Sequence, residues 1–241
     1  MILAALNDYY ARLQDDPDSG ISPPGYSVEK ISYAIVLDRS GKVVAVDDIQ
    51  DTSGKKPVPR GVIVPQKPPG GPNNILPKFL WDKTSYVLGV SSTSKRSERE
   101  HAAFKDFHNE VLAGTSDEGL QALLKFLSSW EPSQFVEHAQ FVVHGNQLLD
   151  KNLIFRLDGE RGWLHDRPAA RRLRLSLLQE EKGSSIGMCL VTGERTSLTR
   201  LHAPIKNIYG GHTAGGFIVS FNEDSYLSYK GSIDKIGRAH V

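Results

Sequence analysis

Basic side chains gather in one stretch of a chain that is otherwise nearly neutral. Residues 55–83 hold six Lys or Arg residues against one acid, Asp82, hence a formal charge of +5, whereas all 241 residues together carry +1. Lys and Arg neutralise phosphates and release their counterions, so this stretch predicts contact with nucleic acid. The alternative is a solvated loop that only aids solubility. The six cations are Lys55, Lys56, Arg60, Lys67, Lys78 and Lys83.

The centre of this stretch, residues 68–74, reads PPGGPNN. Proline lacks an N–H donor and interrupts helices and sheets, so the run predicts a shaped loop. Glycine allows close backbone approach, and asparagine offers a donor and an acceptor to a base edge. In the minor groove the readable signal is chiefly A·T against G·C, so such a loop would sense a short motif. The groove-reading candidates are Gly70, Gly71, Asn73 and Asn74, and the phosphate-binding candidates are Lys55, Lys56, Arg60, Lys67 and Lys78.

Cys189 and His202 suggest a thiolate nucleophile with its base, which would make the chain a hydrolase. Cys189 is the only cysteine and lies between two apolar residues, a context that favours an inert buried thiol. A structural zinc site needs four closely spaced ligands, which this pair does not supply. We therefore expect a protein that is not an enzyme and that needs no metal or cofactor, with the hydrolase as the alternative.

A second arginine cluster lies within a predicted helix over residues 168–181. Arg167, Arg171 and Arg174 follow i, i+4, i+7 spacing and so share one side of that helix. They could add a phosphate-contacting face, while a solvated helix face is the alternative. The acidic residues in the turns before this helix favour capping over acid/base catalysis or metal binding.

The basic loop needs elements that hold both of its ends. Residues 31–38 and 43–49 predict a β-hairpin, since two β-rich runs flank the turn RSGK at residues 39–42. Residues 60–65 predict a strand that leads into the loop, and residues 84–90 predict a strand or turn that leads out of it.

The rest of the chain mixes helices and strands without a βαβ rhythm. That mixture predicts an α+β fold with a mixed, mainly antiparallel sheet and packed helices. Helices are predicted from apolar periodicity and capping residues, and strands from short β-rich runs. Predicted helices cover residues 1–13, 94–113, 116–130 and 168–181, with another beginning at Pro132; predicted strands cover residues 153–160, 186–191 and 217–221.

Composition places the chain among globular proteins, with 39% apolar residues and no apolar run near the roughly 20 residues that span a bilayer. The N-terminus lacks the features of a secretory signal, and one cysteine allows no intrachain disulfide, so we expect a cytoplasmic protein without a membrane partner. Residues 236–241 continue no earlier pattern and match a translated sequencing adaptor. We expect a non-native scar there, which would make residues 1–235 the N-terminal region of a longer protein.

Several phrases, in order along the chain, resemble the N-terminal part of the large subunit of the type I-C CRISPR interference complex (Cascade). Each phrase is short, but the ordered set is specific and extends from Met1 to about Tyr229. The phrases are residues 1–3 (MIL), 6–10 (LNDYY), 23–26 (PPGY), 64–66 (VPQ), 79–89 (FLWDKTSYVLG), 155–159 (FRLDG), 189–194 (CLVTGE) and 219–222 (VSFN).

The resemblance implies a non-catalytic subunit of an RNA-guided surveillance complex in antiviral defence. Such a subunit lies near the 5′ end of the guide RNA and inspects target double-stranded DNA for the protospacer-adjacent motif, while base pairing reads the remaining sequence. The implied partners are target DNA, guide RNA, the backbone and processing subunits, and a helicase-nuclease recruited after target binding. The alternative is a scaffold subunit whose basic stretch contacts guide RNA or neighbouring subunits.

Overall fold

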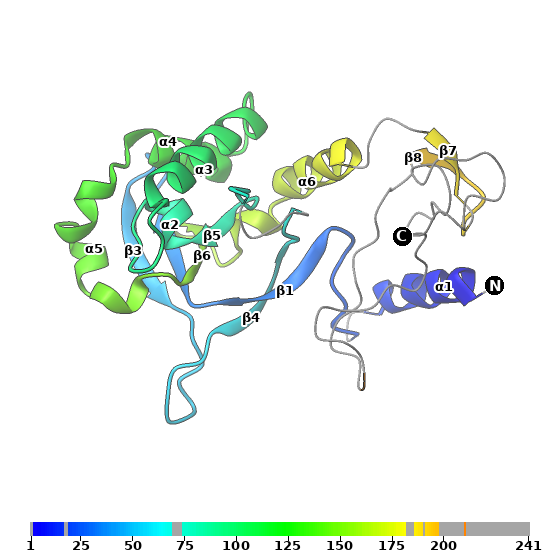
Figure 1. The fold of residues 1–241 in the computed structure, drawn as a ribbon, viewed down its shortest axis with the longest axis horizontal. Coiled ribbons are helices and arrows are strands. Elements are labelled where there is room, and N and C mark those ends of the chain that lie inside the picture. The colour runs from blue at the N-terminus through cyan, green and yellow to red at the C-terminus, as the bar shows by residue number, and fades with distance from the viewer. Residues whose placement is uncertain are drawn as a thin grey trace. The chain divides into compact units, whose positions relative to one another are not determined.

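The computed structural model describes residues 2–16, 19–68, 74–181, 186–189, 191–197 and 210. These residues belong to two compact units, one of residues 22–175 and the other of residues 1–21 with 176–241. Figure 1 shows the elements of both. In the described ranges, none of the helices combines the length and the apolar character needed to cross a membrane. The mixture of helices with mostly antiparallel strands confirms the predicted α+β class.

The larger unit is built on a four-stranded sheet in the order β3-β2-β6-β5. β2 (Tyr33–Leu37) and β3 (Val43–Asp48) form the predicted antiparallel hairpin. β6 (Asn152–Leu157) runs parallel to β2 on its other side, and β5 (Trp81–Lys83) pairs antiparallel with β6. Every residue of β2 is buried, as expected for a strand in the middle of a covered sheet.

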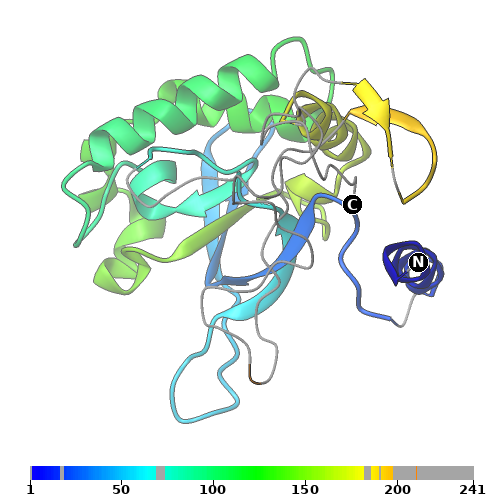
Figure 2. The same ribbon diagram turned by 45° about the vertical axis from the view of Figure 1, so that its right-hand side comes forward.

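A separate two-stranded ribbon carries the chain into the basic stretch. β1 (Tyr26–Ile31) pairs antiparallel with β4 (Arg60–Pro65), and the loop between β3 and β4 extends away from the sheet (Figures 1 and 2). β4 is confirmed as predicted, whereas β1 was not predicted. The inner side of the ribbon packs on the sheet through a cluster of Ile31, Ala34, Val62, Val64, Trp81 and Ile154.

Two neighbouring helices, α3 (Ser97–Val111) and α4 (Glu118–Ser129), cover one side of the sheet (Figure 2). Of Ser116 and Asp117, the two residues whose types favour capping here, Asp117 is the cap of α4, because its carboxylate accepts the N–H groups of Gly119 and Leu120 at 3.0 Å each. The region after Pro132 forms three short helices that continue to the start of β6. They are η1 (Pro132–Val136), α5 (Ala139–Val142) and η2 (Gly145–Leu148).

Residues 84–90 do not form the strand that was one of the two predicted alternatives, and the other alternative, a turn, is found only at residues 88–89. The structure has a short helix, α2 (Thr84–Val87), that begins directly after β5. The N–H of Thr84 donates to the carbonyl of Lys151 at 3.1 Å, and Gly89 ends the turn with φ +73°. Val87 and Leu88 are fully buried, so packing rather than β propensity decides the local structure.

Residues 153–160 and 168–181 hold the strand and helix predicted for them, namely β6 and α6 (Pro168–Glu181), with η3 (Leu164–Asp166) between them. In the smaller unit, α1 (Ile2–Gln14) confirms the predicted first helix. The strand predicted at residues 186–191 is shorter, because β7 (Ile186–Met188) ends before Cys189 and pairs antiparallel with β8 (Arg195–Ser197). The strand predicted at residues 217–221 lies outside the described residues.

Candidate nucleic-acid interface

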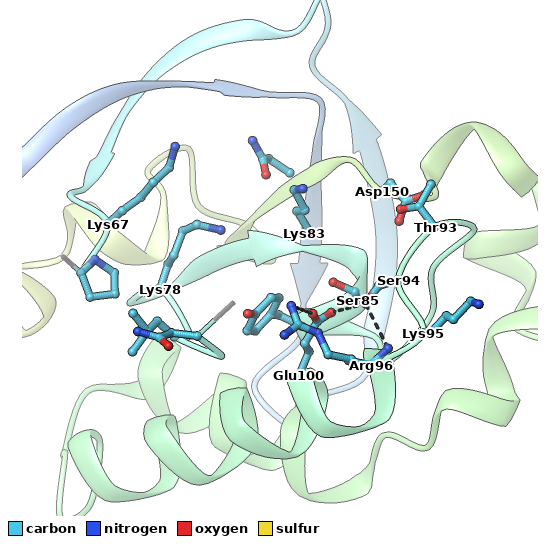
Figure 3. Close-up of a pocket in the computed structure, with 15 residues that line it drawn as sticks. Lys67, Lys78, Lys83, Ser85, Thr93, Ser94, Lys95, Arg96, Glu100 and Asp150 are labelled. Carbon is cyan, nitrogen blue, oxygen red and sulfur yellow. Dashed lines mark hydrogen bonds and ion pairs between the residues drawn. The ribbon is translucent and has the colours of Figure 1, made fainter. Parts of the chain in front are cut away.

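A cleft of about 900 Å³ opens in the larger unit at both ends of the Pro/Gly/Asn loop. Pro68 and Asn74, the described residues that flank residues 69–73, both line it. Figure 3 shows this cleft, with basic side chains along its length. Its cations are Lys67, Lys78, Lys83, Lys95 and Arg96, against two carboxylates, Glu100 and Asp150.

Both carboxylates of the cleft are bound by their own neighbours. Asp150 accepts hydrogen bonds from the hydroxyls of Ser91 and Ser92. Burial alone would raise the pKa of Asp150, but these hydrogen bonds outweigh it and lower the pKa. Glu100 accepts from the hydroxyl of Ser94 at 3.0 Å and forms an ion pair with Arg96 at 3.5 Å. Both carboxylates therefore have hydrogen-bond partners within the protein, and cations outnumber carboxylates five to two among the residues that line the cleft.

Lys78 is held by a buried carboxylate. The ammonium of Lys78 forms an ion pair with Asp82, which is 0% exposed. Burial raises the pKa of Asp82, against the opposing effect of the Lys78 charge. Asp82 also accepts the backbone N–H groups of Lys78 at 3.0 Å and Lys83 at 2.8 Å, and the Lys78 ammonium lies 4.6 Å from the ring centroid of Trp81. The structure therefore uses Lys78 to fix the chain that follows the loop.

The chain that precedes the loop is fixed to the same tryptophan. The indole N–H of Trp81 donates to the carbonyl of Pro65 at 2.7 Å. Lys67 forms an ion pair with Glu29 at 2.9 Å, and its ammonium lies 5.9 Å from the Trp81 ring. Trp81 is fully buried, so it is a core residue that ties together the segments on both sides of residues 69–73.

Two of the three clustered arginines near α6, Arg167 and Arg174, are engaged within the fold, whereas Arg171 is exposed and pairs with Asp166 at 3.4 Å. Arg174 is 3% exposed and donates to the carbonyls of Gly25 at 3.2 Å and Gln66 at 3.3 Å. Arg167 is partly buried and pairs with Asp117 and with Glu160. Both guanidinium groups therefore join elements of the fold, which spacing along the helix could not reveal.

The structure separates the predicted phosphate-binding residues into two groups. Arg60 is exposed at the start of β4, and Lys55 and Lys56 are exposed within the preceding loop, which the bridge between Asp51 and Val58 closes. Lys67 and Lys78 lie beyond the other end of that strand. Since a strand rises about 3.3 Å per residue, its ends are about 17 Å apart. Of the predicted groove-reading residues, Asn74 is exposed, and Gly70, Gly71 and Asn73 lie outside the described residues.

Three cations of the cleft had no role in the sequence-based prediction. Lys83 was counted in the basic stretch only, and Lys95 and Arg96 were placed inside a helix predicted from residue 94. The helix begins at Ser97, so residues 91–96 form a loop at the cleft. The run SSTSKR at these positions was the available signal, because hydroxyl and basic residues together favour anion binding.

His108 holds the backbone just before Trp81. Leu80 has φ +62°, which is unusual for a residue with a side chain, and its N–H donates to Nε2 of His108 at 2.9 Å. Nδ1 of His108 then carries the proton and donates to the carbonyl of Phe104 at 2.8 Å. Complete burial lowers the pKa of His108 to about 4 from its ordinary 6.5. Burial likewise lowers the pKa of His165 to about 4.

These two histidines predict that acid destabilises the fold. Because the unfolded chain binds a proton near pH 6.5 and the folded chain only near pH 4, stability falls as pH falls through this window. For His108 alone we expect a loss of about 2 kcal/mol between pH 7.5 and pH 5. Urea unfolding at both pH values measures it, and the His108→Gln variant should show a smaller pH effect than the parent. Equal stability of the parent protein at the two pH values would contradict the prediction.

The described residues give no sign of a metal centre, and the thiol is enclosed. Cys189 is 1% exposed, and its Sγ accepts the backbone N–H groups of Val191 and Thr192 at 3.4 Å each. His202, its suggested partner, lies outside the described residues. Among the residues that the structure describes, no three His, Cys, Asp or Glu side chains come together as metal ligands.

Comparison with known proteins gives one result that covers nearly the whole chain. No curated protein matches the sequence. A family model, described as CRISPR-associated protein (Cas_Csd1), matches residues 6–239, a span that includes both sides of the cleft and the Pro/Gly/Asn loop between them. The chain therefore belongs to this family of CRISPR-associated proteins.

Proposed function

We propose that the chain is the N-terminal part of a type I-C Cascade large subunit and that it recognises the protospacer-adjacent motif in target double-stranded DNA. In this proposal it is a non-catalytic, DNA-binding subunit. Its partners are guide RNA, the backbone and processing subunits, and a helicase-nuclease recruited after target binding. Membership of a CRISPR-associated family supports a role in such a complex.

The observation that carries the proposal is the anchoring of the chain on both sides of residues 69–73. Pro65 and Lys67 on one side and Lys78 on the other all contact the buried Trp81. A loop whose ends are fixed loses less conformational entropy on binding, which favours reading of a short motif. Asn74 is exposed at the margin of the cleft, where its amide is available to a base edge.

The exposed cations at the start of β4 support a second contact with the same duplex. Arg60 begins β4 and so lies about 17 Å from the end of that strand, and Lys55 and Lys56 precede it in the loop before β4. Phosphates of one DNA strand follow each other at 3.4 Å along the helix axis, so this separation corresponds to about five base pairs. The proposal therefore assigns motif reading to Asn73, Asn74 and the backbone of Gly70 and Gly71, and phosphate binding to the basic residues Lys55, Lys56 and Arg60.

Two alanine variants test this division of roles. Asn73→Ala should lower the ratio of motif to non-motif duplex affinity by about tenfold, because a base-edge contact is lost. Lys55→Ala should weaken binding to all duplexes alike and make the dependence of log K on log salt shallower by about 0.9, the effect of one phosphate contact. Fluorescence anisotropy with duplexes that carry a randomised motif measures both effects.

Asn146→Ala is the matched control, since Asn146 is an exposed asparagine of the larger unit that lies in η2 and does not line the cleft. It should leave both the ratio and the salt dependence unchanged. If Asn73→Ala and Lys55→Ala lower affinity equally on motif and non-motif duplexes, the proposed division of roles is wrong. Binding to guide RNA with no preference for any duplex would favour the scaffold role instead.

A further inference from the structure

The cleft has the size of a site for a few nucleotides of one strand. Its volume of about 900 Å³ lies in the range of roughly 300–1,000 Å³ that encloses ligands of small-molecule size. A double helix, whose major groove alone is about 12 Å wide, cannot enter a concavity of this size. The ligand of the cleft is therefore different in form from the duplex that the Pro/Gly/Asn loop is proposed to inspect.

The cations of the cleft are spread along it and do not converge on one point. Figure 3 places Lys67 and Lys95 at opposite ends, with Lys78 and Lys83 between them. A single phosphate or a metal-bound anion would need donors that point at one centre. Positive charges in a row fit an elongated ligand with repeated negative charges, which is the form of a phosphodiester backbone.

Lys83 and Lys95 are the two lysines of the cleft whose ammonium groups form no ion pair among the described residues. Lys67 and Lys78 have carboxylate partners in Glu29 and Asp82. Among the described residues, by contrast, neither Lys83 nor Lys95 forms an ion pair, and the carboxylates of the cleft itself are already occupied by serines and Arg96. An incoming anion would thus meet two ammonium groups that have no carboxylate partner among the described residues.

An aromatic side chain completes the lining. Tyr86 borders the cleft, half-buried, with the ammonium of Lys78 at 5.7 Å from its ring centroid. Proteins that bind single strands combine a positively charged groove with aromatic rings on which bases stack. The combination of Tyr86 with spaced lysines therefore favours an unpaired nucleic-acid strand over an acidic peptide, which has no base to stack.

We infer that the cleft binds an unpaired strand of nucleic acid through its phosphodiesters, with Lys83 and Lys95 as the principal contacts. The inference depends on the proposed function for the statement that nucleic acid is the ligand. It assigns to the same protein a second contact, which is distinct from the reading of duplex DNA by residues 70–74. Single-stranded DNA and RNA share the phosphodiester, so both are tested.

The test compares charge-reversal variants of the full chain with labelled ten-nucleotide strands of DNA and RNA in an anisotropy titration. The Lys83→Glu/Lys95→Glu variant should bind the preferred strand at least ten times more weakly than the parent. Its dependence of log K on log salt should be shallower by about 1.4, since each phosphate contact on a single strand contributes about 0.7. A Lys83→Gln/Lys95→Gln variant should show the same change in slope without added repulsion.

Lys42→Glu/Arg161→Glu is the matched control. Both residues are exposed cations of the larger unit that do not line the cleft, and the change in net charge is the same. This variant should bind single strands within twofold of the parent. Unchanged circular dichroism and thermal melting of the cleft variants would show that their folds are intact.

Three outcomes would overturn the inference. The first is single-strand binding by the two cleft variants at parental strength, and the second is an equal loss in the control variant. The third is displacement of the strand by ATP as effectively as by unlabelled strand, which would identify a site for a free nucleotide. A preference for RNA or a preference for DNA would each support the site, and it would show which of the two nucleic acids the cleft binds.

Failure of single-strand binding by the cleft can be distinguished experimentally from failure of motif recognition. Failure of motif recognition would appear as Asn73→Ala binding all duplexes like the parent, with the single-strand titration unaffected. Failure of the cleft would appear as parental single-strand binding in Lys83→Glu/Lys95→Glu, while Asn73→Ala still alters motif preference. Each proposal therefore has a variant whose result does not depend on the other.

Discussion

Gly41→Ala is expected to destabilise the larger unit by about 3 kcal/mol, because it combines backbone strain with overpacking. Gly41 lies in the turn between β2 and β3 with φ +85°, a conformation that disfavours a side chain. An added Cβ would lie 2.6 Å from the backbone nitrogen of Phe126 and 2.9 Å from the carbonyl oxygen of Ala122, both in α4. Neither backbone atom can move without shifting the helix. Chemical unfolding followed by tryptophan fluorescence measures the loss.

Gly114→Ala separates the two causes. Gly114 has φ +74°, close to that of Gly41, but nothing lies within 4 Å of a Cβ added there. Its replacement should therefore cost only the strain, about 1 kcal/mol. The excess for Gly41→Ala measures how tightly the hairpin turn packs on α4. Equal losses in the two variants would mean that the turn does not contact the helix.

The same turn explains which parts of the fold were predictable. Asp38 accepts the N–H groups of Ser40 at 2.8 Å and Lys42 at 2.9 Å, so local chemistry specifies this hairpin and the sequence predicts it. The parallel pairing of β2 with β6 joins residues more than a hundred positions apart, and no local pattern encodes it. β5 has three residues, which is too short for a period to be recognised.

The sequence indicates that the candidate site is basic, but it does not show which of its lysines are paired and which face the cleft. The composition of residues 55–83 indicates a basic region that contributes Lys67, Lys78 and Lys83 to the cleft, but counting charges treats every lysine as available. Glu29 lies outside that stretch, yet it pairs with Lys67, and Asp82 is buried against Lys78. Lys83 and Lys95 face one cleft only because β5, α2 and the loop before α3 fold together. Tertiary contacts therefore decide which charges can meet a ligand.

Asp82→Ala is expected to destabilise the protein by about 3–5 kcal/mol, the usual result of removing one partner of a buried ion pair. The variant leaves the ammonium of Lys78, which is 14% exposed, without its carboxylate. It also leaves the N–H groups of Lys78 and Lys83 without their acceptor. Urea unfolding of the variant against the parent measures the loss.

A variant that removes both charges identifies the origin of that loss. Lys78→Met/Asp82→Leu removes both charges together, so it should be more stable than Asp82→Ala alone, although the two backbone N–H groups still lack an acceptor. Glu118→Ala provides the contrast, since it breaks the pair with Arg39 in which both side chains are well exposed, and it should change stability far less. If Asp82→Ala and Glu118→Ala proved equally mild, Asp82 would be open to solvent. The chain after the Pro/Gly/Asn loop would then lack its anchor, and the anchored loop on which motif reading depends would be lost with it.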